Sequence, residues 1–356
     1  MTHTEAGNTK TPQRKRFLIG QLGCFGDCLY ATTVARQIKN DFPDCHLTWA
    51  IGSRYQSILN GNPYIDAIWE YPLSAGDDMA VRWQQFENEA IERKNKGDFD
   101  EIFLTQLYPN NFRNFDGTVR SSIFRGYTRP ITVPMAPVLC LSDAEVENAR
   151  HFAETHALRN KEQVILFECA PSSGQSFVTP AFAHEVSKKI IEKHPKCCII
   201  LSSNRPFLSD HVQIIDGSVL SFRENAEITK YCTLLIGCSG GISWLCTSDW
   251  AKPLPMIQLL KKEDGAYASV VRDHEYNGLE THSIIEMTDC PAETISTCIQ
   301  AIFNEGFESA RQKYHQRIKA NSIFYLRIVY IYLLKKGRYR DAVLSMGYFI
   351  KRWFLI

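Results

Sequence analysis

The sequence contains no uninterrupted run of about 18 apolar residues, which is the length that a helix needs to cross a bilayer. We therefore expect no membrane-spanning helix. Residues 1–15 are polar and lack the apolar core of a signal peptide. We expect this stretch to be disordered, and we expect no signal peptide.

The 12 cysteines include no C-x-x-C pair, the spacing that is typical of zinc knuckles and redox motifs. They are instead scattered among apolar residues, as Cys169, Cys198 and Cys232 illustrate. This pattern is typical of reduced, buried thiols. The sequence therefore predicts a cytoplasmic protein without a disulfide framework and without a metal site.

Two common nucleotide-binding motifs are also missing. The chain has no G-K-[ST], which excludes a P-loop, and it has no G-x-G-x-x-G fingerprint. Gly20, Gly23 and Gly26 instead follow a G-x-x-G-x-x-G spacing, and no acidic residue follows the second expected strand, 46–51. An acid at that place would bind the ribose of NAD, so its absence argues against an NAD site.

What the chain does have is an alternation of apolar runs with amphipathic stretches, which predicts mainly parallel sheets covered by helices. Two such series follow one another, as a first domain at 16–158 and a second at 159–305. The expected strands are 16–21, 46–51, 67–71, 101–106, 163–168, 197–201, 219–220, 234–237 and 255–260. The expected helices are 30–42, 81–96, one that opens at Ser142, 180–194, 224–231 and 242–248.

Two Rossmann-like domains would face each other across a shared cleft, because open α/β sheets bind ligands beyond the carboxyl ends of their strands. Three turns would line it: 23–27, 169–176 and 237–243. Asp27 ends the first turn, where the start of a helix suits an anion, although Asp is also an ordinary N-cap. The third turn, GCSGGIS, suits a diphosphate or is only a tight strand-to-helix turn.

Segment 306–356 differs in charge from the rest of the chain. It carries eleven Lys or Arg against two acids, whereas residues 1–305 carry 29 basic and 37 acidic residues. Its apolar, aromatic stretch 323–334 predicts a helix, either on an anionic membrane surface or packed on the body or on a second copy. No nucleic-acid-binding motif accompanies the basic residues, so we expect no nucleic-acid partner.

Three stretches together carry a resemblance to a known family: LGCFGD at 22–27, GNPYID at 61–66 and IGCSGGISWLCTSDWAKP at 236–253. With them, residues 16–305 resemble the ADP-heptose:lipopolysaccharide heptosyltransferases of glycosyltransferase family 9. The resemblance implies a GT-B fold and inverting, metal-independent transfer of a heptose-like sugar from a nucleotide sugar, ADP-linked in the family. The acceptor would be a hydroxyl of lipopolysaccharide, another surface glycan or protein. No cofactor beyond the nucleotide sugar is implied.

The resemblance also implies roles for individual residues. Asp27 would be the general base that deprotonates the acceptor, with a basicity lowered by the helix dipole, and Gly23 and Gly26 would lie on the acceptor or phosphate side. The residues implied in donor binding are Ser172, Ser173, Gln175, Ser202, Asn204, Leu220, Ser239, Gly240, Gly241 and Ser243.

Departures from the family keep two alternatives open. The family commonly has a lysine after the first phosphate loop, but this chain has Gln175–Phe177 at that place. In the later turn, this chain has Ser239 and Trp244 where the family has an acid and a histidine. The residues that could replace the missing charge are Arg120, Arg125, Arg205 and Arg223. A nucleotide-sugar-binding protein without turnover, or a homo-oligomeric scaffold assembled through the tail, fits these departures as well.

Overall fold

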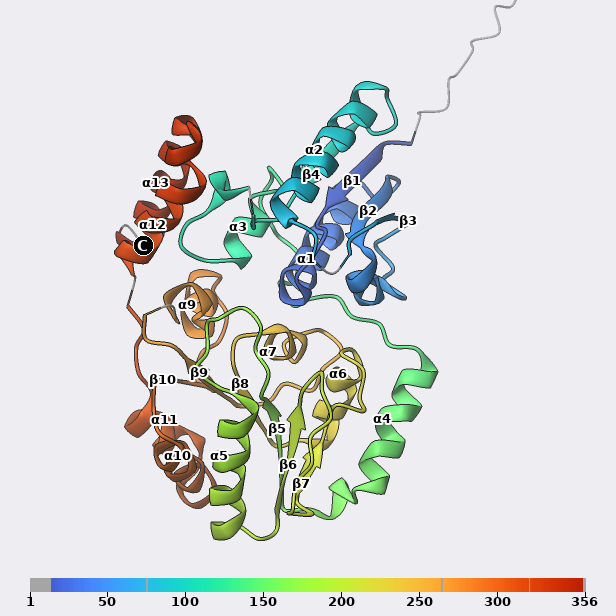
Figure 1. Ribbon diagram of the computed structural model, residues 1–356. Coiled ribbons are helices and arrows are strands. Elements are labelled where there is room, and N and C mark those ends of the chain that lie inside the picture. The colour runs from blue at the N-terminus through green and yellow to red at the C-terminus, as the bar shows by residue number, and fades with distance from the viewer. Residues whose placement is uncertain (1–13, 75, 110, 264, 320, 355–356) are drawn as a thin grey trace, which may run out of the picture.

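The computed structural model describes residues 14–354 apart from 75, 110, 264 and 320 (Figure 1). Most of the predicted disordered N-terminus, 1–13, lies outside the described residues. The chain forms two α/β domains, each built around a parallel sheet, and Figure 1 shows them one above the other. The two-domain architecture agrees with the alternation in the sequence.

The first sheet has the order β3-β2-β1-β4. Its strands are β1 (Arg16–Gly20), β2 (His46–Gly52), β3 (Ala67–Tyr71) and β4 (Glu101–Leu104). Phe17 lies beside Leu47 of β2 and Glu101 of β4, and the apolar run of β1 is fully buried. Such burial is expected of a strand that is covered on both faces. The covering helices include α1 (Phe25–Asp41), α2 (Met79–Asn95) and α3 (Arg120–Phe124).

The second sheet has the order β10-β9-β8-β5-β6-β7. Its strands are β5 (Gln163–Glu168), β6 (Cys197–Ser202), β7 (Ile214–Asp216), β8 (Leu234–Gly237), β9 (Met256–Leu260) and β10 (Ile284–Thr288). Its helices are α5 (Pro180–Lys193), α6 (Glu224–Ile228), α7 (Gly241–Leu245), α8 (Gly265–Ala268), α9 (Val270–Tyr276), α10 (Ala292–Glu305) and α11 (Phe307–Tyr314).

Two strand predictions differ from the structure. The predicted strand 219–220 is wrong, because Leu220 donates its amide to the carbonyl of Gly217 in a turn, and the edge strand is β7 instead. Strand 101–106 ends early, at Leu104, and beyond it the side chain of Gln106 accepts the amide of Leu22 in the loop after β1. Strand β10 was not predicted.

The domain boundary lies earlier than the predicted residue 158. Helix α4 (Asp143–Thr155) begins at Ser142 with a capping box, as expected, but it lies along the second domain against α6. Asn148 of α4 donates to the Glu224 carboxylate of α6 at 3.1 Å. The chain therefore passes between the domains before Ser142.

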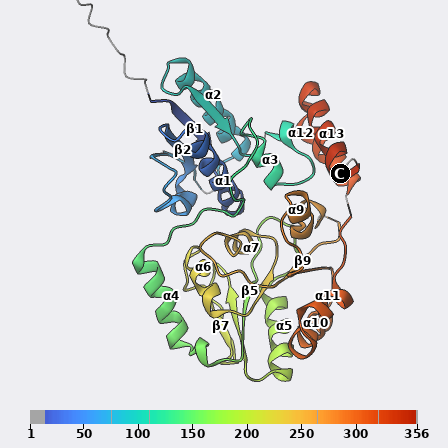
Figure 2. The ribbon, with the colours of Figure 1, turned by 180° about the vertical axis from the view of Figure 1, so that it is seen from behind.

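The C-terminal tail returns to the first domain, next to α3 in Figures 1 and 2. Helices α12 (Ser322–Tyr332) and α13 (Tyr339–Phe354) pack on the segment 107–117. The ring of Tyr325 stacks on Phe349 at 3.8 Å and on Phe115 at 5.7 Å, measured between centroids. One side of the tail thus packs on the body, as one of the sequence alternatives predicts. Within the described part of the chain, no helix is both long and apolar enough to cross a membrane.

Candidate functional site

The two domains meet where α1, which follows β1, approaches α7, which follows β8. A Cβ atom on Gly26 would lie 3.3 Å from Cδ1 of Trp244, and one on Gly241 would lie 3.3 Å from the Cβ of Phe25. Phe25 also contacts Phe222, with ring centroids 4.5 Å apart. Glycine at positions 26 and 241 therefore lets the starts of the two helices lie against each other.

A buried arginine joins the domains beside this contact. The guanidinium of Arg120 lies over the rings of Tyr30 and Trp244, at 4.7 and 5.1 Å from their centroids. Its Nε also lies 3.2 Å from Oδ2 of Asp273, on α9 of the second domain. Both charged side chains are buried, so this pair is shielded from salt and solvent. Arg120, one of the candidates for the missing positive charge, is thus engaged between the two domains.

Asp27 lies in the first turn of α1, at the start of this contact. Burial raises the pKa of its carboxyl to about 7. Among the described residues, no hydrogen bond or ion pair holds the carboxylate. Desolvation of the charge is the cause of this increase in pKa. The N-cap interpretation is wrong, because Cys24 occupies that position with a φ of 68°.

The glycine turn before Asp27 is held by a side chain that we did not predict. Oε1 of Gln106 accepts the amides of Leu22 and Gly23, at 2.6 and 3.1 Å. Position 23 favours glycine for a steric reason, because a Cβ there would lie 3.0 Å from the ring of Tyr55. The amide of Gly23 is thus occupied and is not offered to a phosphate. The strand and turn patterns in the sequence do not indicate that Gln106 would hold this turn.

The predicted diphosphate turn, 237–243, is filled by Glu168 from the end of β5. The Glu168 carboxylate accepts the amides of Cys238, Gly240 and Ile242 at 2.9 to 3.3 Å, and the hydroxyl of Ser243 at 2.6 Å. A carboxylate therefore occupies the place that the sequence assigned to the donor anion. The signal in the sequence is an acid at the last position of a buried strand.

Ser239 of this turn is also engaged within the protein. The amide of Ser239 is bound by Oε1 of Gln258 at 2.8 Å, and its hydroxyl donates to the carbonyl of Ala268 at 2.6 Å. The carbonyl of Ser239 accepts Nε2 of Gln175 at 3.0 Å. The predicted donor-binding residues Ser239, Gly240 and Ser243 thus direct these hydrogen-bond donors to partners within the protein. Gly241 contributes close packing.

Other predicted donor-binding residues separate into buried and exposed groups. Ser202 and Leu220 are buried, and the carbonyl of Ser202 accepts the amide of Cys169 at 3.1 Å. In contrast, Ser172, Ser173 and Asn204 are exposed. These three residues follow β5 and β6 at the carboxyl end of the second sheet, where ligands of α/β sheets bind.

Two further candidate arginines are occupied. Arg125 pairs with Asp116 at 2.8 Å. Arg223 donates to the carbonyls of Ser57 and Asn60 in the first domain, at 2.9 and 3.0 Å, and pairs with Glu145 at 2.6 Å. Each guanidinium is thus already bound by oxygen atoms of the protein.

Among the described residues, the cations that remain at the carboxyl end of the second sheet include Arg205, Lys261 and Lys262. Arg205 is exposed just beyond β6. Lys261, which the sequence reading missed, follows β9 directly, and its amide donates to the carbonyl of Gln175 at 2.9 Å. That hydrogen bond places the backbone of Lys261 beside the loop 169–176. The described residues hold no group of three or more His, Cys, Asp and Glu side chains arranged to bind a metal ion.

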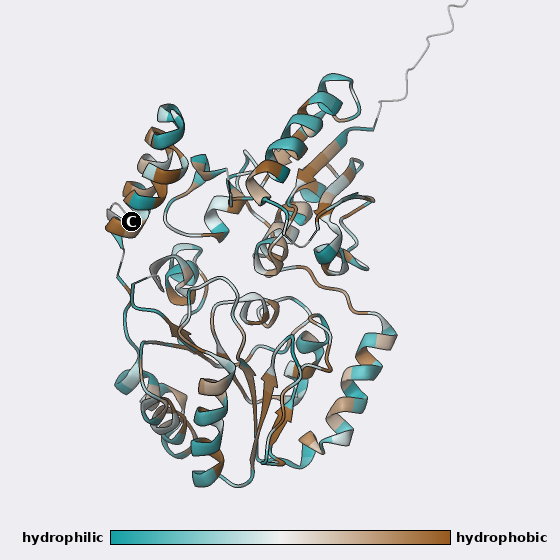
Figure 3. Ribbon diagram, viewed as in Figure 1, coloured by the Kyte–Doolittle hydropathy of each residue, from teal (hydrophilic) through white to brown (hydrophobic). Residues whose placement is uncertain are grey.

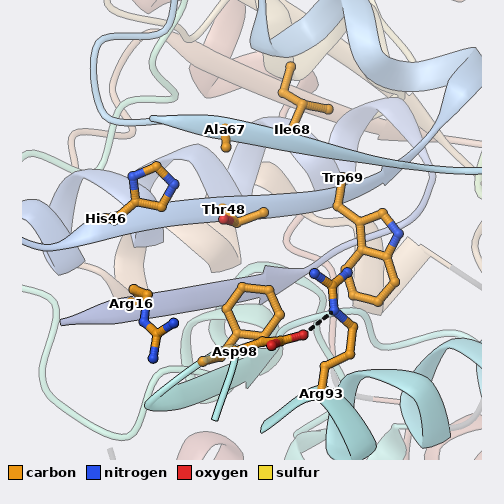
Figure 4. Close-up of a pocket in the computed structure, with 9 residues that line it drawn as sticks. Arg16, His46, Thr48, Ala67, Ile68, Trp69, Arg93 and Asp98 are labelled. Atoms are coloured by element: carbon orange, nitrogen blue, oxygen red, sulfur yellow. Dashed lines mark hydrogen bonds and ion pairs between the residues drawn. The ribbon is translucent and has the colours of Figure 1, made fainter. Parts of the chain in front are cut away.

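A pocket in the first domain lies at the opposite end of the sheet (Figure 4). Its lining includes Arg16, His46 and Ala67, the first residues of β1, β2 and β3. Arg93 pairs there with Asp98 at 3.1 Å and lies over the ring of Trp69. This pocket is at the amino ends of the strands, so it is distinct from the contact around Asp27.

The arrangement of two parallel-sheet domains is the GT-B fold, as the sequence predicts. It is shared with the crystal structure of a glycosyl transferase family 9 protein from Veillonella parvula, with 12% identity, a TM-score of 0.51, and coverage of 83% of this chain and 93% of that one. It is also shared with ADP-heptose lps heptosyltransferase II of E. coli, with 11% identity, a TM-score of 0.53, and coverage of 82% and 99%. No family model and no curated protein matches the sequence. At these identities the likeness establishes the fold.

Proposed function

We propose that this protein is a heptosyltransferase-like glycosyltransferase. It would move a heptose-like sugar from a nucleotide sugar, ADP-linked by analogy with the E. coli neighbour, to a hydroxyl of lipopolysaccharide, another surface glycan or protein. The observation that carries the proposal is the Asp27 carboxyl, with a pKa raised to about 7, at the contact between the domains of a GT-B fold. A carboxylate with such a pKa is suited to general-base catalysis at neutral pH.

The proposed reaction is a single displacement with inversion at the anomeric carbon. The acceptor oxygen attacks that carbon while Asp27 removes the proton from the acceptor hydroxyl. The bond between the sugar and the diphosphate breaks, and the nucleoside diphosphate leaves with the electron pair. Asp27 then returns its proton to solvent. This step needs neither a metal nor a cofactor beyond the nucleotide sugar.

We place the donor diphosphate at the exposed loops beyond β5 and β6, because the turn before α7 is occupied by Glu168. Ser172 and Ser173 would donate hydrogen bonds to it. Lys261 and Arg205 would supply the positive charge that stabilises the leaving group. All four residues lie at the carboxyl end of the second sheet.

A cytoplasmic location agrees with the chemistry of the cysteines. All 12 are free thiols, and ten of them are buried. A reducing compartment keeps such thiols in the free state. In that compartment the protein would have access to nucleotide sugars and to the hydroxyls of nascent surface glycans.

A thermal-shift screen tests the donor assignment. We expect an ADP-sugar to raise the midpoint of unfolding more than GDP-, UDP- or CDP-sugars, because a ligand that binds only the folded chain stabilises it. Lys261→Ala should weaken the shift, whereas Lys94→Ala, at an exposed position on α2, should leave it unchanged. Equal shifts in the two variants would contradict the role of Lys261.

The pH profile tests the state of Asp27. A general base acts only when it is ionised, so kcat/KM should rise with pH and level off above the pKa of about 7. Below that pKa, the rate should fall about tenfold for each pH unit, in proportion to the ionised fraction. Steady-state rates between about pH 5 and 9 measure this. A flat profile below neutrality would contradict the assignment.

A further inference from the structure

Each helix of the C-terminal tail has an inner face that is buried against the first domain. On α12 this face consists of Tyr325 and Val329, and Leu333 continues it at the C-cap, so that the three residues are spaced four positions apart. On α13 it includes Ser345, whose hydroxyl donates to the carbonyl of Phe115 at 2.7 Å, and Phe349. Because both inner faces contact the segment 107–117, the opposite faces of the two helices look away from the first domain.

Those opposite faces are apolar, and they follow helical spacing. On α12, Ile323, Leu326 and Tyr330 are exposed, with 83% of the Ile323 surface accessible, and Leu334 continues the line just beyond the helix. On α13, the corresponding exposed residues are Tyr339, Val343, Met346 and Ile350. We call these eight residues the outer tail face. Surface helices ordinarily place polar residues on the side that faces water, so exposed apolar residues in such a line are unusual.

The outer tail face is also where exposed apolar surface is concentrated. Among the described residues, 17 large hydrophobic side chains are exposed, and ten of them lie between Ile323 and Ile350. The other seven are distributed along the remaining chain, as single exposed apolar residues are in most proteins. Figure 3 shows hydrophobic residues interspersed with polar ones on both tail helices. A concentration of this kind marks an interaction surface.

Basic side chains border the outer tail face. Arg327, Lys335, Arg340 and Lys351 are exposed, and none of them has an ion-pair partner among the described residues. Asp341 is the one acidic residue in the sequence between 321 and 354, and it pairs with Arg338 at 2.7 Å. The border therefore carries an uncompensated positive charge.

We propose that the outer tail face docks on the surface of an anionic lipid bilayer. Apolar side chains with a basic border suit the boundary between acyl chains and negatively charged headgroups. A symmetric contact between two copies of this face is disfavoured, because it would bring Arg327, Arg340 and Lys351 of each copy together without acids to neutralise them. The proposal does not depend on the catalytic role of Asp27.

Vesicle co-sedimentation of the full chain tests the docking. The probes are phosphatidylcholine vesicles and vesicles with about one-third phosphatidylglycerol, which provides the negative surface. We expect binding to the anionic vesicles that exceeds binding to neutral ones by about tenfold or more, and that weakens when salt is raised from ~0.1 to ~0.5 M.

Two pairs of substitutions separate the apolar and the charged contributions. Val343→Glu with Ile350→Glu removes the apolar contact, and Arg340→Glu with Lys351→Glu reverses the charge of the border. Each double variant should lose about tenfold or more of the vesicle binding. The matched controls are Leu208→Glu, at a side chain that is 96% exposed, and Lys94→Glu, and both should bind as the wild type does. All these positions are exposed, so thermal midpoints should match the wild type.

Three results would overturn the proposal. The first is the absence of binding to either kind of vesicle. The second is equal binding to neutral and anionic vesicles. The third is concentration-dependent self-association in sedimentation velocity that Val343→Glu with Ile350→Glu abolishes, which would assign the face to a second copy of this chain.

Discussion

Replacing Asp27 with asparagine is expected to reduce sugar transfer by about 10²- to 10⁴-fold while donor binding stays unchanged. The asparagine amide has nearly the shape of the carboxylate but cannot take the acceptor proton. The position lies at the start of α1, apart from the loops beyond β5 and β6 that we assign to the donor. Release of nucleoside diphosphate measures turnover, and calorimetry with the nucleotide sugar measures binding.

The control for this experiment is Asp44→Asn, because Asp44 is an exposed aspartate of the same domain. It should retain wild-type turnover. If Asp27→Asn keeps its turnover, Asp27 is not the general base. If the wild-type chain binds donors and transfers no sugar to any acceptor of the panel, the alternative of a binding protein without turnover replaces our proposal.

Glu168→Gln is expected to lower the free energy of unfolding by about 2–4 kcal/mol. The Glu168 carboxylate accepts three backbone amides and the Ser243 hydroxyl in a buried site. A glutamine side chain has one acceptor oxygen, and its NH₂ group would face N–H donors that lose their partner. Equilibrium denaturation followed by circular dichroism measures the change.

Glu162→Gln is the matched control, because Glu162 is an exposed glutamate in the same domain that pairs only with Lys196 at the surface. Exposed ion pairs contribute little, so this variant should unfold as the wild type does. If both variants unfold alike, Glu168 does not hold the turn before α7. The sequence-based interpretation of this turn as a diphosphate site would then regain support.

The fold could be predicted from the sequence because its signals are local. The buried apolar run of β1, the glycines after it and the capping box at Ser142 each act within a few residues of the chain. Features that depend on contacts between residues far apart in the sequence were harder to predict. Strand β7 has only three residues, and α4 packs against a helix about 75 positions later, which a pattern along the chain does not reveal.

The candidate site was predicted less completely for the same reason. Asp27 was identified because the motif around it is contiguous. The engagement of Glu168 with the turn at Gly240 joins residues 72 positions apart, and that of Arg120 with Asp273 joins the two domains. Such contacts decide whether a loop amide or an arginine already has a partner within the protein. Sequence patterns do not reveal these contacts, so they could not show which of these groups were engaged.

The return of the tail to the first domain affects how the two domains can move. The chain passes from the first domain to the second before α4, and it passes back between α11 and α12. The second domain is therefore tethered at both of its ends. Rotation about the line through these two crossings strains neither connection, whereas twisting one domain over the other would stretch both. Two connections therefore restrict the relative motion of the domains more than a single linker would.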